Sequence, residues 1–416
     1  MKVLHISHSD SSGGAARAAY RIHRALLDSD VNSKMWVSQS LSDDWTVTEW
    51  GGRAEKAKNL VRRQVAHAWR GLLKTTSEVL HSPAVMSSAL VQRINRSDAD
   101  VVNLHWVQGE MLSVADIGRI EKPLVWTLHD MWAVCGAEHL SFDGRWKEGY
   151  LPGNRPEEES GFDLNRWTWN RKARGWKAPI QIVAPSRWLA GCVRESALMS
   201  GWPVTVIPNP IDTEIWKPLP QATARGLLGL PPGVPLLLFG AIGGTNDPLK
   251  GFSLLRDSLR RMRREKMAEN TELVVFGQGE PRTRVDLGFP VHYVGHVNDN
   301  LTLRILYNSA DVMLVPSRIE AFGQTAVEAN ACGTPVVAFD TSGLRDIVNH
   351  RQTGYLADPF DSDDFSEGIL WVYKKLSAGR NSFEAEVRRS AVERFSYSLV
   401  GEQYKSTLAD AHRKTR

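Results

Sequence analysis

The sequence predicts an α/β protein made of two Rossmann-like units in tandem, and three observations support this fold class. The 416 residues exceed what one compact core usually holds, so the length favours more than one domain. Apolar runs of strand length alternate with helical periodicity, which is the pattern of parallel sheets covered by helices. This alternation stops at a proline-rich segment, 208–220, and then restarts.

The expected strands are short apolar runs on both sides of that segment. They fall at 2–8, 33–37, 101–106, 124–129, 181–184 and 204–207 in the first half, and at 236–240, 273–277, 292–294, 312–315 and 335–339 in the second. Parallel strands of a buried sheet read as such runs because both of their faces are covered.

The proline-rich segment supplies the predicted domain boundary. Proline lacks an amide donor and restricts the residue before it, so this segment cannot continue a helix or a central strand. We expect an N-terminal domain at 1–208 and a C-terminal domain at 209–394. The helical tail at 395–416 could pack back across the hinge.

Composition narrows the class of protein. With 42% hydrophobic and 24% charged residues the chain reads as an ordinary water-soluble globular protein. A net charge of +4 is too small to imply nucleic acid as a partner. The three cysteines have neither zinc-site nor disulfide spacing, and the N-terminus reads as a strand rather than a signal peptide. No stretch approaches the roughly 20 apolar residues of a membrane span, so we expect a cytoplasmic protein.

A basic segment between residues 53 and 74 has helical periodicity. Its cations include Arg62, Arg63 and Arg70, and apolar residues are interleaved with them. Such a helix can lie on an anionic bilayer, which would bring the protein to the inner face of the cell membrane. A solvated helix face explains the same charges, and the sequence leaves both interpretations open.

Two glycine-containing turns are candidates for binding phosphate. In the first, the strand at 2–8 is followed by Gly13 and Gly14, which open a helix. Glycine lets the backbone approach an anion, and a helix N-terminus supplies oriented amides. In the second, Gly240 ends a strand and Lys250 stands near the next helix, where its ammonium suits a diphosphate. A structural turn and a solvated lysine remain the alternatives.

The segment 316–338 carries the strongest signal. It reads PSRIEAFGQTAVEANACGTPVVA, with Glu320 in the loop after a strand and Glu328 about two helical turns later. Both carboxylates can face the carboxyl end of a sheet, where open α/β folds bind ligands, and a carboxylate can accept two sugar hydroxyls at once. Spacing alone favours this interpretation and a pair of solvated glutamates equally.

This segment resembles the retaining glycosyltransferases of family four, which have the GT-B fold of two Rossmann-like domains around a cleft. The two glutamates with seven residues between them match the family signature. The likeness extends from Gly13 and Gly14 through the sequence IPNPID at 207–212 to the tail. It therefore covers nearly the whole chain.

The resemblance implies roles for individual residues. Glu328 would hold the donor ribose, while Glu320 and the backbone of Ala321, Phe322 and Gly323 would hold the sugar hydroxyls. Lys250 would contact the diphosphate, which also approaches Gly13 and Gly14. His129, at the end of the strand 124–129, would face the transferred sugar. Without the resemblance, His129 would read as a histidine satisfied inside a sheet end.

Two departures from the family pattern concern activity. Many members carry an arginine a few residues before the lysine, where this chain has 241–244 without one. Close relatives also tend to have several cysteines after the segment 129–132, whereas this chain has only Cys135. The pairs Asp98/Asp100 and Asp361/Asp363 are interpreted as surface or helix-cap residues. We therefore expect no metal and no other cofactor.

Three functions follow as hypotheses. The first is a retaining transferase that moves a sugar from a nucleotide-diphosphate sugar to a glycan or lipid-linked acceptor in exopolysaccharide, capsule or cell-surface glycan synthesis. The second is a nucleotide-sugar epimerase of the same fold. The third is a non-catalytic nucleotide-sugar-binding protein, favoured by the missing arginine and cysteines. Neither the donor's base and sugar nor the acceptor follows from a spacing rule.

Overall fold

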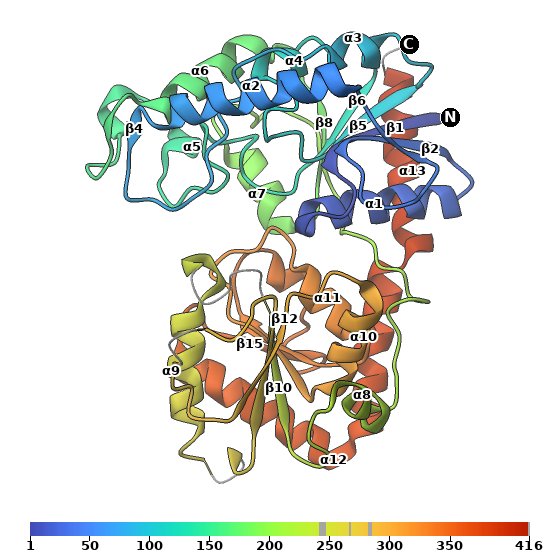
Figure 1. Cartoon of the computed structure of the whole chain (residues 1–416), viewed down its shortest axis with the longest axis vertical. Helices are drawn as coiled ribbons and strands as arrows, with labels where there is room; N and C mark the ends of the chain where they lie inside the picture. Colours follow the sequence, from blue (N-terminus) through green and yellow to red (C-terminus); the bar gives the residue numbers. More distant parts are fainter. Residues whose placement is uncertain (241–246, 266–267, 282–284, 415–416) are drawn as a thin grey trace. The chain divides into compact units, whose positions relative to one another are not determined.

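The computed structural model describes residues 1–240, 247–265, 268–281 and 285–414. These residues form two compact units (Figure 1). Unit 1 contains Met1–Pro210 and the C-terminal segment that begins at Val400, and unit 2 contains Ile211–Leu399. The predicted hinge segment thus contains the boundary between Pro210 and Ile211. The predicted segment 241–244 lies outside the described residues.

Unit 1 is built on a seven-stranded sheet in the order β3-β2-β1-β5-β6-β8-β9. Every pairing in it is parallel, so all its strands end at one edge. The strands are β1 (Lys2–Ser9), β2 (Asn32–Gln39), β3 (Val47–Glu49), β5 (Val101–Leu104), β6 (Leu124–Thr127), β8 (Gln181–Ala184) and β9 (Val204–Val206). The strand order reverses between β1 and β5, which is where sheets of this kind bind ligands.

Helices and a short antiparallel pair of strands accompany this sheet in unit 1. The helices are α1 (Gly13–Asp28), α2 (Arg53–Arg70), α3 (Leu90–Asn95), α4 (Val114–Ile117), α5 (Arg145–Glu148), η1 (Pro152–Asn154), α6 (Leu164–Gly175) and α7 (Arg187–Glu195). The pair is β4 (Leu73–Lys74) with β7 (Ser160–Gly161). Helix α2 packs on α6 through Trp69 and Trp167, whose stacked ring centroids lie 4.4 Å apart.

The tail helix α13 (Tyr397–Lys414) belongs largely to unit 1. Its apolar face, with Val400, Tyr404 and Leu408, is buried in one core with Ile22 of α1 and Val3 of β1. Figure 1 shows this red helix running beside the blue N-terminal elements. The last helix in the chain therefore completes the first domain's core.

Unit 2 has a six-stranded parallel sheet in the order β12-β11-β10-β13-β14-β15. Its strands are β10 (Leu236–Gly240), β11 (Glu272–Phe276), β12 (Val291–Gly295), β13 (Val312–Val315), β14 (Val336–Phe339) and β15 (Gly354–Ala357). Its helices are α8 (Gln221–Leu228), η2 (Pro248–Lys250), α9 (Phe252–Met262), α10 (Asn300–Ser309), α11 (Gln324–Ala331), η4 (Ser342–Asp346) and α12 (Ser362–Phe395). Both parallel sheets confirm the predicted α/β class.

The predicted membrane-surface role of Arg62 is wrong. Its side chain is 4% exposed and its guanidinium pairs with Glu55 at 2.5 Å on the same helix, α2. A buried, paired arginine cannot reach a bilayer. The neighbouring Leu60 and Val61 are instead exposed. Among the described residues, no helix is both long and apolar enough to span a membrane.

Candidate functional site

In unit 2, an ion pair joins two of the predicted site residues. Lys250 ends η2 and Glu320 lies in the loop after β13, and Lys250 Nζ is 2.7 Å from Glu320 Oε1. The two loops are also tied by a backbone hydrogen bond of 2.8 Å from Arg318 N to Leu249 O. The negative charge of Glu320 raises the pKa of Lys250, so the lysine stays cationic at neutral pH. Lys250 and Glu320 are 70 residues apart in the sequence and meet at the carboxyl edge of the sheet.

Hydroxyl groups hold Glu320 in place. Ser317 Oγ donates to Glu320 Oε1 at 3.0 Å, and Ser342 Oγ accepts from Glu320 N at 2.9 Å. Gly343 N also donates to Glu320 O at 2.9 Å. Sequence reasoning did not identify these serines, although both stand close to strand ends, which was the available signal.

Glu328 sits deeper, on α11, with a side chain that is almost fully buried. Tyr307 of α10 donates a hydrogen bond of 2.7 Å to Glu328 Oε2. A buried carboxylate needs such partners, because its transfer out of water costs free energy unless new hydrogen bonds replace those to water. The solvated-glutamate alternative is therefore wrong for Glu328.

The backbone between the two glutamates leads into the N-terminus of α11. Gly323 is its N-cap and has a φ of 114°, a left-handed conformation that favours glycine. Phe322 points into the core and packs against Phe395. The Phe322 side chain is thus committed to the core, and the backbone role predicted for Ala321, Phe322 and Gly323 stays a prediction.

Gly240 has a structural reason to be glycine. A Cβ atom there would lie 2.0 Å from the ring of Phe276 on the neighbouring strand β11. Its predicted contact with phosphate stays a prediction, because the residues that follow, 241–246, lie outside the described part of the chain.

In unit 1, Gly13 and Gly14 form the first turn of α1, directly after β1. Gly13 has a φ of 86°, and no atom lies within 4 Å of a Cβ built on either glycine. The N-cap Ser12 makes no side-chain cap hydrogen bond. Open space beside a helix N-terminus without a side-chain cap suits an anion.

His129, which follows β6, ends a chain of three imidazoles. His105 Nδ1 lies 3.1 Å from His129 Nε2, and His105 Nε2 lies 2.8 Å from His5 Nδ1. Burial lowers the pKa of His129 to about 4, and it also lowers the pKa values of His5 and His105 well below their usual range. All three rings are therefore neutral at pH 7.

Neutrality links the tautomers of these rings. Each shared hydrogen bond needs one N–H and one bare nitrogen, so all three carry their proton on Nδ1 or all three on Nε2. The proton on the outer nitrogen of His129 thus depends on His105 and His5. This chain was not predicted from the sequence, because it joins strands about 100 and 24 residues apart.

The neighbouring His23 gives a pH prediction. Burial lowers its pKa to about 4, against 6.5 in an unfolded chain. Between these two pKa values the unfolded chain binds more protons than the folded one. The free energy of unfolding therefore has its full value above about pH 6.5 and decreases as the pH falls. At pH 5 the loss is about 2 kcal/mol. Calorimetry should show the transition containing unit 1 falling in temperature from about pH 8 to about pH 5.

The replacement His23→Gln is the control for that prediction. Glutamine can still donate to or accept from Ser33 and Thr46, which bond the two ring nitrogens at 2.7 Å each. The variant should therefore show a shallower pH dependence of its transition temperature. An unchanged slope would contradict the assignment to His23.

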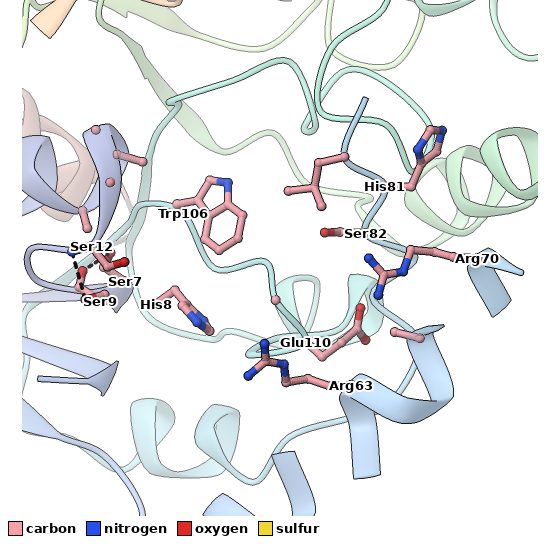
Figure 2. A pocket seen from close by; sticks show the side chains of 17 residues that line it. Ser7, His8, Ser9, Ser12, Arg63, Arg70, His81, Ser82, Trp106 and Glu110 are labelled. Atoms are coloured by element: carbon pink, nitrogen blue, oxygen red, sulfur yellow. Dashed lines mark hydrogen bonds between the residues drawn. The ribbon is translucent and has the colours of Figure 1, made fainter. Parts of the chain in front are cut away.

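A cavity of about 460 Å³ lies at the carboxyl edge of the unit 1 sheet. Figure 2 shows the side chains that line it, including His8 and Trp106 from strand ends and Arg63 and Arg70 from α2. The structure thus gives these two arginines a position that the membrane-surface prediction did not include. Gly13 and Gly14 line the same cavity.

A polar network fixes one wall of this cavity. Trp106 Nε1 donates to Asp130 Oδ2 at 2.9 Å, and His139 Nδ1 lies 2.6 Å from the same oxygen. His139 Nε2 in turn lies 2.8 Å from Ser82 Oγ. Asp130 directly follows His129 in the sequence, so the cavity wall and the imidazole chain share one loop.

The predicted site residues fall into two groups. Lys250, Glu320, Ala321, Phe322, Gly323 and Glu328 lie along adjacent loops of unit 2, while Gly13, Gly14 and His129 lie in unit 1. Each group stands at the carboxyl edge of its own sheet. Their roles toward a donor stay predictions.

The acidic pairs have structural partners. Asp361 caps α12 by accepting from the amides of Asp363 and Asp364. Asp98 is exposed and pairs with Lys2 at 2.9 Å. These contacts confirm their interpretation as surface and cap residues. Across the described residues, no group of three or more histidine, cysteine, aspartate or glutamate side chains is arranged to hold a metal ion.

Comparison with known families covers both units. A model described as "Glycosyltransferase Family 4" matches residues 12–215, and one described as "Glycosyl transferases group 1" matches residues 237–375. A D-inositol 3-phosphate glycosyltransferase of Xylanimonas cellulosilytica is 31% identical over 362 residues, which span 80% of this chain and 77% of that protein. The chain belongs to glycosyltransferase family 4. The predicted family and enzyme class are thereby confirmed.

Another relative and two solved structures are also similar to this chain. A D-inositol 3-phosphate glycosyltransferase of an Arthrobacter species is 26% identical over 363 residues, which span 81% of this glycosyltransferase and 78% of its relative. Sucrose-phosphate synthase from Thermosynechococcus elongatus superposes with a TM-score of 0.65 at 17% identity, over the whole of both chains. Anabaena HepE in complex with UDP-glucose gives a TM-score of 0.63 at 18% identity, over 99% and 100% of the chains. These structures confirm the GT-B fold.

Proposed function

We propose that this glycosyltransferase transfers a sugar from a nucleotide-diphosphate sugar and retains its anomeric configuration. The observation that carries the proposal is the Lys250–Glu320 pair beside the N-terminus of α11 in unit 2. Lysine offers a cation to a diphosphate, and the carboxylate offers acceptors to sugar hydroxyls. The structure of Anabaena HepE with UDP-glucose supports such a donor.

The proposed transfer breaks the bond between the anomeric carbon and the diphosphate oxygen. The acceptor oxygen forms the new bond on the same face, and the acceptor proton passes to an oxygen of the leaving diphosphate. Negative charge grows on that diphosphate as the bond breaks. Lys250 and helix-terminal amides would stabilise this charge, and fixed charges in a site of low polarity contribute strongly to catalysis.

No metal ion is needed in this proposal. Lys250 supplies a positive charge that a divalent cation supplies in other transferases, and it keeps that charge because Glu320 raises its pKa. We expect turnover to survive EDTA unchanged. A loss of activity that Mg²⁺ or Mn²⁺ restores would contradict a metal-independent reaction.

The proposed acceptor is a glycan or a lipid-linked sugar, in the synthesis of exopolysaccharide, capsule or another cell-surface glycan. Peripheral contact with an anionic membrane would bring the enzyme to such an acceptor. Leu60 and Val61 support this contact because they are exposed on α2, next to the exposed Lys58. Replacing both apolar residues by serine should weaken binding to anionic liposomes, while equal binding would remove the membrane clause.

Incubation with a panel of nucleotide sugars tests the reaction class. The transferase should bind one donor, seen as a rise in its melting temperature, and release nucleoside diphosphate faster when an acceptor is added. Conversion of the donor to an epimer without acceptor would favour the epimerase hypothesis. If the protein binds a nucleotide sugar without turnover, and Glu320→Ala and Lys250→Ala bind it as well as the parent does, a non-catalytic role would be favoured.

A further inference from the structure

The cavity of unit 1 carries an excess of positive charge. Arg63 and Arg70 are seven residues apart on α2, which places them on one face of the helix, and both line the cavity. Within the part of the chain that the structure describes, neither guanidinium forms an ion pair. Figure 2 shows both side chains entering the cavity from α2.

Two buried nitrogen atoms in the cavity wall lack a partner. They are Arg70 Nε and His8 Nδ1. Buried donors and acceptors in folded proteins are nearly always satisfied by protein, water or ligand. Burial and the nearby charge of Arg63 lower the pKa of His8, so this ring is neutral and can accept or donate a hydrogen bond. These atoms therefore favour a polar ligand.

Glu110 is the acidic side chain in the lining, and its carboxylate is already engaged. Ala84 N donates to Glu110 Oε1 at 3.1 Å, and Val85 N donates to Oε2 at 3.2 Å. Because two backbone amides hold it, Glu110 serves to fix the segment beside it. One carboxylate also leaves the charge of the two arginines only partly compensated.

The opposite side of the cavity adds further attraction for an anion. Gly13 and Gly14 bring the N-terminus of α1 into the lining, and the N-cap Ser12 makes no side-chain cap hydrogen bond there. A helix N-terminus carries a partial positive charge. The α1 terminus, Arg63 and Arg70 therefore act on the same cavity.

The remaining wall suits a sugar ring. Trp106 presents an indole whose orientation is fixed by its hydrogen bond to Asp130, and Ser82 supplies a hydroxyl beside it. A volume of about 460 Å³ is in the range of pockets that hold small ligands. An aromatic wall facing two cations fits a sugar that bears an anionic group.

We propose that this cavity binds a phosphoryl group on the acceptor, with Arg63 and Arg70 as its cationic ligands and Trp106 against the acceptor sugar. This inference rests on the proposed transferase function and names its acceptor class as a phosphorylated sugar. The phosphoryl group belongs either to a soluble sugar phosphate or to a lipid phosphate carrier. The chemistry at the arginines is the same for both.

Calorimetric titration with glucose 6-phosphate, and with glucose as the uncharged probe, tests the proposal. A saturating nucleoside diphosphate chosen from UDP, GDP and ADP would fill the donor site first. We expect glucose 6-phosphate to bind more tightly than glucose, and Arg63→Met and Arg70→Met each to weaken it about 10-fold or more, because a hydrogen bond to a charged group is lost. Lys58→Met, an exposed cation on the same helix, should leave it unchanged.

Vesicles of phosphatidylcholine, with and without undecaprenyl phosphate, distinguish the source of the phosphate. If binding to the vesicles that contain undecaprenyl phosphate depends on Arg63, the phosphate belongs to the lipid carrier. If binding of glucose 6-phosphate depends on Arg63, the phosphate belongs to the soluble sugar. If both probes bind the arginine variants as well as the parent, or if neither binds the parent, the proposal is overturned. Since Arg63 is exposed, its replacement should preserve the fold, and an unchanged melting temperature checks this.

Failure of this inference is separable from failure of the proposed function. The substitution Lys250→Met removes the proposed diphosphate contact of unit 2 and changes no residue that lines the cavity of unit 1. The glucose 6-phosphate titration is therefore repeated with this variant. A protein that turns over a nucleotide sugar but is indifferent to Arg63 and Arg70 keeps the transferase function and loses the anionic acceptor. If the protein binds no nucleotide but binds glucose 6-phosphate through Arg63, the anion site is kept and the transferase function is lost.

Discussion

Replacing Lys250 by methionine should lower kcat/KM for the nucleotide sugar by about 100-fold or more, the size of effect found when one group that stabilises a developing charge is removed. The methionine side chain fills a similar volume but offers no charge to the diphosphate. The fold should persist, because the Lys250–Glu320 pair is partly exposed and such pairs contribute about 1 kcal/mol or less. Steady-state kinetics and a melting curve together measure both effects.

The partner replacement Glu320→Gln should behave differently. In the protein without donor, Glu320 competes with a diphosphate for the ammonium of Lys250, so glutamine should leave nucleoside diphosphate affinity unchanged or higher. Turnover should still fall, because the carboxylate that accepts sugar hydroxyls is gone. Ser317 can donate to the glutamine oxygen as it does to the carboxylate, which keeps the side chain in place. Equal losses of diphosphate affinity in Glu320→Gln and Lys250→Met would contradict these separate roles.

The sheets could be predicted from sequence because their strands are short and continuously apolar. Every expected strand has a counterpart in the structure, usually within two residues. The missed strands are β3, β4 and β7, which have three residues or fewer, and β15. Strand β15 begins with Gly354, whose Cβ would lie 2.1 Å from Val336 O, so close packing rather than strand propensity favours glycine at its first position.

The residues predicted to bind the donor were found through the family resemblance, and the structure shows which contacts hold their side chains. Spacing favoured solvated and functional glutamates equally, whereas burial of Glu328 against Tyr307 separates it from a surface residue. No one-dimensional pattern could reveal that Ser342 positions Glu320, because the contact joins two loops of the folded sheet.

The basic helix shows the opposite kind of error. Charge and periodicity correctly predicted a helix at α2, but they could not distinguish which cations face water. Arg62 is buried against Glu55, while Arg63 and Arg70 face a cavity whose other walls come from strand ends far away in the sequence. The role of each basic residue on α2 therefore depends on the tertiary contacts that its side chain makes, which the sequence pattern does not contain.

The turn that carries Lys250 leads to the second large effect. Gly251 follows the lysine with a φ of 66°, and a Cβ there would lie 1.9 Å from the carbonyl oxygen of Pro316. That oxygen belongs to the loop that presents Glu320, so Gly251→Ala must push the two loops apart. We expect the variant to lose about 2 kcal/mol or more of unfolding free energy, as strained or overpacked positions do. Its kcat/KM should approach that of Lys250→Met.

Gly229 provides a matched control, because it has nearly the same backbone conformation, with a φ of 64°, but open space around its Cβ position. Gly229→Ala should therefore lose only the cost of a left-handed alanine, about 1 kcal/mol, and keep full activity. The difference between the two variants isolates the contact between the Gly251 turn and Pro316. Equal destabilisation in calorimetry, with activity retained in both, would mean that the approach of these loops does not position Lys250.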